Sequence, residues 1–154
     1  MRLALAQLDV QAASVDANLD RAEAAIREAA AEGADLVALP ELFDVGFFAF
    51  EAYQRVAEGL DGEKLTRMRA VAADAGVAVL AGSVVEDLAE SGSGPADEGL
   101  ANTSVLFDAD GERRLVYRKH HLFGYESAEA ELLVPGESVP TTDLLGFTVA
   151  TTTC

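Results

Sequence analysis

Three short stretches of this chain each contain one side chain that can take part in nucleophilic or acid–base chemistry. Glu41 lies in LPELF, Lys119 lies in VYRKHHLF, and Cys154, the only cysteine, follows TVATTT. A thiol is a strong nucleophile only as the thiolate, which a neighbouring base or cation promotes. Glu41 is a candidate base for the thiol proton. Lys119 is a candidate stabiliser of the oxyanion that forms when sulfur attacks a carbonyl or nitrile carbon.

Each of these residues also has a simpler interpretation. Glu41 directly follows Pro40 and is equally typical of a turn or a helix cap. Lysines are usually solvated, and a lone cysteine at the end of an apolar run is most often a small core residue. A zinc site of His120, His121 and Cys154 is disfavoured, because neighbouring side chains on an extended segment point to opposite sides. We therefore predict neither a metal nor a cofactor.

The hydrophobic pattern predicts the elements that would position these residues. Strands are expected over 3–10, 35–39, 77–85, 100–108, 112–118 and 146–153, the last buried and leading to Cys154, with helices around 19–29 and 65–75. Residues 87–99 are expected to form a surface loop and 120–143 an irregular segment. The strand, helix, strand order predicts an α/β fold. Because side chains that follow strand ends gather in one crevice of such a sheet, the three reactive groups are expected to meet.

Taken together, the motifs resemble one family. LPELF, the strand-turn-strand NTSVLFDADGERRLVYRKHHLF, ELLVPGE and the final run to Cys154 have the order and spacing of the carbon–nitrogen hydrolases of the nitrilase superfamily. The resemblance implies a four-layer α-β-β-α sandwich. Residues 1–154 would then be its N-terminal part, a single hydrolase domain truncated at its C-terminal side, since family members continue well past the nucleophile.

The resemblance also implies roles for individual residues. Glu41 would be the general base, Lys119 the electrostatic stabiliser and Cys154 the nucleophile. Glu131, four residues before Pro135 in ELLVPGE, matches a second glutamate that helps to position substrate in many members. The alternative for Glu131 is an ordinary surface acid within an acidic stretch.

The implied activity is the hydrolysis of non-peptide carbon–nitrogen bonds. We expect an amidase that releases ammonia from a small aliphatic or ω-amide through a cysteine thioester, with a nitrile as the other substrate class. Family members usually form dimers through the sandwich, so a homodimer is expected of the complete protein. The alternative is a catalytically inactive half-domain that serves as an interaction or assembly module.

Composition excludes several classes of partner. The chain has 154 residues with 27 acidic and 11 basic side chains, a net charge of −16. This balance argues against binding to nucleic acid or to an anionic membrane, because both require basic patches. A single cysteine cannot build an internal disulfide framework, and the chain begins without a cleavage-site pattern. We therefore expect a cytoplasmic protein.

The acidic surface also predicts a dependence on salt. Only two of the basic residues are lysines, and an acidic, lysine-poor composition resembles that of proteins from salt-rich cytoplasm. Repulsion among the excess carboxylates weakens as the Debye length falls to about 3 Å near 1 M salt. We expect the midpoint of thermal unfolding to rise between low and molar salt; an unchanged midpoint would contradict the halophilic interpretation.

Overall fold

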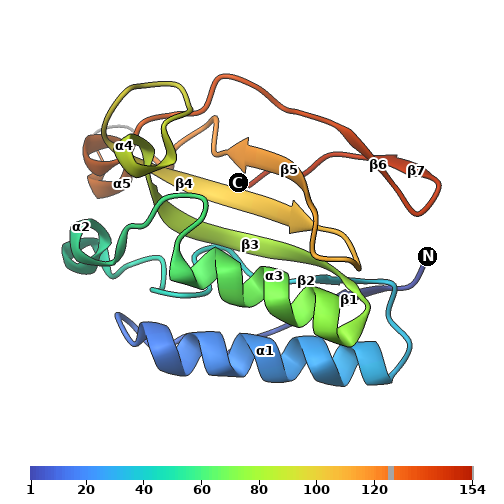
Figure 1. Ribbon diagram of the computed structural model, residues 1–154. Coiled ribbons are helices and arrows are strands. Elements are labelled where there is room, and N and C mark those ends of the chain that lie inside the picture. The colour runs from blue at the N-terminus through green and yellow to red at the C-terminus, as the bar shows by residue number, and fades with distance from the viewer. Residues whose placement is uncertain (125–126, 154) are drawn as a thin grey trace.

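Five of the six predicted strands form a sheet, in which they lie side by side in chain order. The computed structural model describes residues 1–124 and 127–153. Parallel pairing joins β1 (Leu3–Leu5), β2 (Leu36–Ala38) and β3 (Ala78–Asp87), and antiparallel pairing adds β4 (Leu100–Phe107) and β5 (Arg113–Arg118) (Figure 1). Strand β5 therefore runs in the same direction as β2. Consequently, the C-terminal ends of β2 and β5 lie at the same end of the sheet as the N-terminal end of β4.

Two helices cover one face of this sheet. Helix α1 (Val15–Ala31) and helix α3 (Glu63–Ala75) lie next to each other beneath it (Figure 1). The predicted spacing is confirmed, since Leu19 and Ile26 of α1 and Met68 of α3 are buried in the core cluster between the helices and the sheet. Full burial of such a side chain stabilises a fold by roughly 1.5–3 kcal/mol, so the packing of these helices on the sheet contributes to stability.

The opposite face of the sheet is only partly covered by the residues that the structure describes. Leu106 and Leu115 are buried there together with Leu144 of β6 (Thr142–Leu144). The segment that follows β5, which includes β6, lies over this face (Figure 1). On the edge strand β1, however, Leu3 and Leu5 remain 49% and 77% exposed. The sheet therefore presents apolar surface that the described residues do not bury.

The predicted buried strand over 146–153 is wrong. Strand β7 (Phe147–Val149) pairs with β6 (Thr142–Leu144) in a separate two-stranded hairpin, and Phe147 is 51% exposed. The two residues between these strands, Leu145 and Gly146, both have positive φ, as a type I′ hairpin turn requires. The turn makes a local pairing possible, which the β-branched composition of the segment does not reveal.

Short helical turns occupy the segment after the second strand, the expected surface loop 87–99 and the expected irregular segment 120–143. They are η1 (Phe50–Ala52) with α2 (Tyr53–Val56) after the second strand, α4 (Leu88–Ser91) in the predicted loop, and α5 (Ala128–Leu132). A single turn is too short to show a helical period, so hydrophobic spacing could not predict these elements. The first strand is also shorter than predicted, because pairing with β2 ends at Leu5.

The segment that leaves β2 crosses closely over β3. A Cβ atom on Gly82 would collide with the carbonyl oxygens of Leu39 and Pro40. The backbone then turns at Leu42, which has a φ of 46° although it is not glycine, and whose N–H donates to Ser83 Oγ at 2.9 Å. Positive φ is unfavourable for a branched side chain and persists only where the surroundings impose it.

We expect Gly82→Ala to destabilise the protein by roughly 1–3 kcal/mol, because the added methyl group would force this crossing apart. Urea unfolding would measure the effect. Gly76→Ala is the matched control: Gly76 has a φ of 62° but open space around its Cβ position, so it reports backbone strain alone. Equal losses of stability in the two variants would contradict a tight crossing at Gly82.

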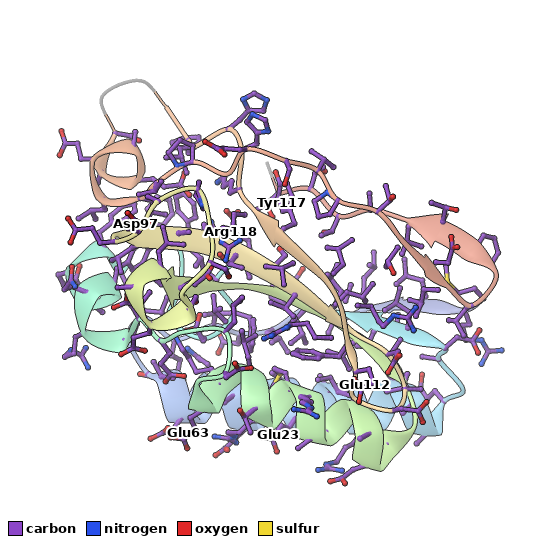
Figure 2. The ribbon with its side chains drawn as sticks, turned by 45° about the horizontal axis from the view of Figure 1, so that its top comes forward. Glu23, Glu63, Asp97, Glu112, Tyr117 and Arg118 are labelled. Atoms are coloured by element: carbon purple, nitrogen blue, oxygen red, sulfur yellow. The ribbon has the colours of Figure 1, made fainter. Side chains whose placement is uncertain are left out.

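Acidic side chains occur both at the surface and in the core, whereas both lysines are buried. Figure 2 shows Glu63, Asp97 and Glu112 at the periphery of the molecule, and all three are exposed. Both lysines, Lys64 and Lys119, are instead buried against carboxylates. Among the described residues, no helix is long and apolar enough to cross a membrane.

Candidate active site

Lys119 directly follows β5 and is held in place by its backbone. Its N–H donates to the carbonyl oxygen of Asn102 at 2.8 Å, and its own carbonyl accepts from the N–H of Gly136 at 3.0 Å. The preceding residue, Arg118 (Figure 2), makes two hydrogen bonds to the buried carboxylate of Glu86, at 2.6 and 2.8 Å. These contacts fix the end of β5 against β4 and β3, so the Lys119 side chain starts from a rigid base.

The Lys119 side chain extends into a buried cluster of carboxylates. Its Nζ lies 2.8 Å from Glu41 Oε1 and 3.0 Å from Glu129 Oε1, and the residue is only 1% exposed. Glu129 is fully buried, whereas the side chain of Glu41 is 27% exposed. Two acids thus share one cation, and Glu41 alone of the two remains accessible to a reacting group.

Asn102, at the start of β4, completes this cluster. Its Nδ2 donates to Glu41 Oε1 at 2.8 Å and to Glu129 Oε1 at 3.2 Å. Because the amide offers one hydrogen to each carboxylate, it offsets part of their excess negative charge and sets their separation. Sequence reasoning missed Asn102, although its place at the start of a strand beside the end of β5 offers a signal once the pairing is known.

Lys119 remains a cation in this environment. Burial alone would lower the pKa of the ammonium group, but the hydrogen bonds and charges of Glu41 and Glu129 outweigh it and raise the pKa above the ordinary 10.5. The stability that the cluster gains from this charge is therefore fully present below pH 10.5 and is lost only as the pH rises through the raised value. Lys119 is suited to stabilising negative charge, and is not suited to acting as a neutral base.

An aromatic group forms the wall beside the lysine. The centroid of the Phe47 ring lies 5.3 Å from Lys119 Nζ. The Phe123 ring packs edge-on against the Phe47 ring, with 6.0 Å between the two centroids. The Tyr53 hydroxyl donates to the Phe47 carbonyl at 2.6 Å. Burial, and then the charges of Glu129, Glu41 and Asp44, raise the pKa of Tyr53, so the phenol stays neutral.

Glu131 lies apart from this cluster. It is exposed on α5, whereas Glu129 on the same helix turns inward and also accepts from the N–H of Phe123. Glu129 is four residues before the buried Leu133, so the two share one face of the turn, and Glu131 lies on another. The spacing between Glu129 and Leu133 is the sequence signal that could have singled out Glu129. Glu131 makes no contact with Lys119 among the described residues, and its role in positioning substrate stays a prediction.

Cys154 lies outside the described residues, but the residue before it is placed. Thr153 Oγ1 lies 3.4 Å from Ser104 Oγ on β4. Ser104 is two residues after Asn102, and residues two apart on a strand project from the same face. The described chain therefore ends next to the strand whose Asn102 contacts Glu41 and Glu129.

The neighbouring histidines do not behave as the sequence argument assumed. Residues 120 and 121 form a bend, both side chains are exposed, and their rings stack with centroids 4.9 Å apart. The two side chains do not point to opposite sides as predicted, because the backbone bends here and is not extended. Among residues 1–124 and 127–153, no group of three or more His, Cys, Asp or Glu side chains is arranged to hold a metal ion.

A hollow of about 650 Å³ adjoins His120 and His121. It lies between the loop that follows Lys119, where Leu122 and Phe123 line it, and the segment that precedes Cys154, where Thr152 and Thr153 line it. A space of this volume is within the range of small-molecule sites.

The sequence model of the carbon-nitrogen hydrolase family matches residues 2–154. The chain belongs to this family. The resemblance to the nitrilase superfamily is therefore confirmed, and with it the assignment of the chain to a family of carbon–nitrogen hydrolases.

Named relatives of this carbon-nitrogen hydrolase family member are amidases. Omega-amidase NIT2 of Homo sapiens is 35% identical over 148 residues, covering 92% of this chain and 50% of that protein. The 2-oxoglutaramate amidase of Paenarthrobacter nicotinovorans is 38% identical over 104 residues, covering 68% of this chain and 34% of that protein. The chain thus spans about half the length, or less, of the curated relatives it matches.

A solved structure shows the same fold. The amidase of Nesterenkonia sp. AN1, in a form with acrylamide added to the active-site cysteine of that enzyme, superposes with a TM-score of 0.81 at 28% sequence identity. The match covers 97% of this chain and 56% of that one. The α/β fold of the nitrilase type is therefore confirmed for the chain, which supplies a helix layer and a sheet layer of it.

Proposed function

We propose that this chain is the N-terminal part of an amidase that hydrolyses a small aliphatic or ω-amide through a thioester on Cys154. The observation that supports the proposal most directly is the buried Lys119 ammonium group, held at 2.8 Å by the partly accessible carboxylate of Glu41. Burying a charge costs free energy, so a buried cation beside an accessible acid is more typical of a reactive site than of a stabilising contact.

In the proposed first half-reaction, the Cys154 thiol gives its proton to Glu41 and the sulfur attacks the amide carbon. A carbon–sulfur bond forms while the carbonyl electron pair moves to oxygen, and Lys119 stabilises the resulting negative charge. The tetrahedral species then collapses. The carbon–nitrogen bond breaks, and Glu41 returns the proton to the leaving nitrogen, which departs as ammonia.

In the second half-reaction, Glu41 takes a proton from a water molecule, which attacks the thioester carbon. Lys119 again stabilises the oxyanion, the carbon–sulfur bond breaks, and the proton restores the thiol as the carboxylic acid departs. Glu129 and Asn102 do not exchange protons in this scheme. They hold Lys119 and Glu41 in the reactive arrangement before substrate arrives, which lowers the cost of reorganisation.

The hollow beside Phe123 and Thr153 is the proposed entry for substrate. Its aromatic wall suits the apolar part of a small acyl group. A small amide is proposed over a nitrile because the named relatives are amidases.

Ammonia release tests the proposed function. The 154-residue chain and its Cys154→Ala variant are compared on a panel of small aliphatic amides and ω-amides, with the exposed Ser138→Ala as a matched control. We expect turnover in the wild type and in Ser138→Ala, and none in Cys154→Ala. Absence of Cys154-dependent turnover would remove the proposal for this chain and favour an assembly module.

A second measurement does not need turnover. Acrylamide is expected to alkylate Cys154 faster than it alkylates free cysteine at the same pH, because Glu41 and Lys119 promote the thiolate. Mass spectrometry of the intact chain would follow the addition. An alkylation rate equal to that of free cysteine, unchanged by Glu41→Gln, would contradict an activated thiol.

A further inference from the structure

The second lysine of the chain is also buried against an acid. Lys64 on α3 is 2% exposed, and its Nζ donates to Asp44 Oδ2 at 2.9 Å and to the carbonyl oxygen of Val56 at 2.7 Å. Asp44 is fully buried, and its Oδ1 has no hydrogen-bond partner among the described residues. A buried ion pair recovers little net free energy after desolvation, so stability by itself does not account for this arrangement.

Asp44 lies three residues after Glu41, in the turn formed by residues 41–46. This turn is held from several elements: Ser83 of β3 accepts from the N–H of Leu42, and Asn18 of α1 donates to the carbonyl of Asp44 at 2.8 Å. The positive φ of Leu42 means that the conformation is imposed by such contacts. Lys64 on α3 donates to Asp44 of this turn and also to the carbonyl oxygen of Val56, so it links the turn to α3 and to the end of α2.

The two ion pairs are also neighbours in space. Glu41, which contacts Lys119, and Asp44, which contacts Lys64, are three residues apart in this one turn. The turn is thus in contact with both Lys119 and Lys64. Each of the chain's two lysines neutralises an acid of the same short segment.

We propose that Lys64, acting through Asp44, is a positioning residue that holds the 41–46 turn so that the Glu41 carboxylate reaches Lys119. An apolar pair of the same volume would fill the space but would not orient the turn in the same way, because it lacks the strong charge-assisted hydrogen bond between Lys64 and Asp44. Any consequence for catalysis rests on the proposed function, whereas the positioning of Glu41 does not.

The chain's two lysines make a direct test possible. A carbon–nitrogen correlation spectrum of lysine side chains contains two signals, and Lys64→Met leaves that of Lys119 alone. Glu41→Gln gives the reference position of the Lys119 signal when the contact with the carboxylate is removed. We expect Lys64→Met to move the Lys119 signal toward that reference, in samples whose circular dichroism shows a folded chain.

Asp44→Asn provides a second variant in case Lys64→Met does not fold. It keeps the shape of the side chain and a neutral hydrogen-bond acceptor for Lys64, and we expect a smaller shift of the Lys119 signal in the same direction. Arg67→Met is the matched control on the same helix, because Arg67 pairs with Asp20 and Glu23 on α1 and does not contact the turn. We expect no shift in this variant.

An unchanged Lys119 signal in folded Asp44→Asn and Lys64→Met chains would overturn the proposal, as would an equal shift in Arg67→Met. Where turnover is measurable, the positioning pair predicts a kcat lower by on the order of 100-fold with little change in KM, since the general base is misplaced. A chain that shows the shift but hydrolyses no amide would keep the positioning pair and remove the proposed function.

Discussion

Lys119→Met is expected to abolish Cys154-dependent amide hydrolysis and to lower the free energy of unfolding by about 3–5 kcal/mol. Methionine keeps the volume of the side chain but removes the cation that Glu41 and Glu129 share. Glu129 is fully buried, so its carboxylate would lose its charged partner without gaining water. Urea unfolding would measure the loss of stability, and ammonia release the loss of turnover.

Arg27→Met is the matched control for this experiment. Arg27 Nη2 lies 3.6 Å from Asp74 Oδ2, and both side chains are more than half exposed. Exposed pairs contribute little, so we expect a change below about 1 kcal/mol and unaltered turnover. If Lys119→Met were as stable as Arg27→Met, the buried cluster would not be the tightly coupled unit that its geometry indicates.

Glu129→Gln is expected to reduce turnover on the order of 100-fold, whereas Glu131→Gln should leave it within about twofold. Glutamine retains the shape of Glu129 but offers Lys119 a neutral oxygen, so the ammonium group would be free to shift toward Glu41. Glu131 is exposed and belongs to the same helix, which makes its variant a matched control. Steady-state ammonia release measures both.

The comparison of these two variants also decides between two interpretations of the acidic stretch. A larger effect in Glu131→Gln would support the role predicted for Glu131 from its spacing to Pro135, and would leave Glu129 as a structural acid. A larger effect in Glu129→Gln would instead assign the positioning role to the glutamate that contacts Lys119.

Much of the layer architecture follows from local pattern. The helix with buried Leu19 and Ile26, the helix that ends at Ala75, and the hairpin around DADG all lie close to their expected positions. Their lengths exceed one period of the hydrophobic repeat, so burial of one face determines them. The one-turn helices and the β6–β7 hairpin depend on a few backbone angles and could not be predicted in this way.

The sequence by itself determined the family, the α/β layers and the two residues, Glu41 and Lys119, that the structure brings within 2.8 Å. Motif order and strand ends are local properties, and they suffice for these conclusions. Only the tertiary structure decided that Glu129 faces the cluster while Glu131 faces solvent, and that Asn102 joins both carboxylates. The physical reason is that burial of a charged or amide side chain depends on partners contributed by distant strands and helices, and no local pattern specifies them.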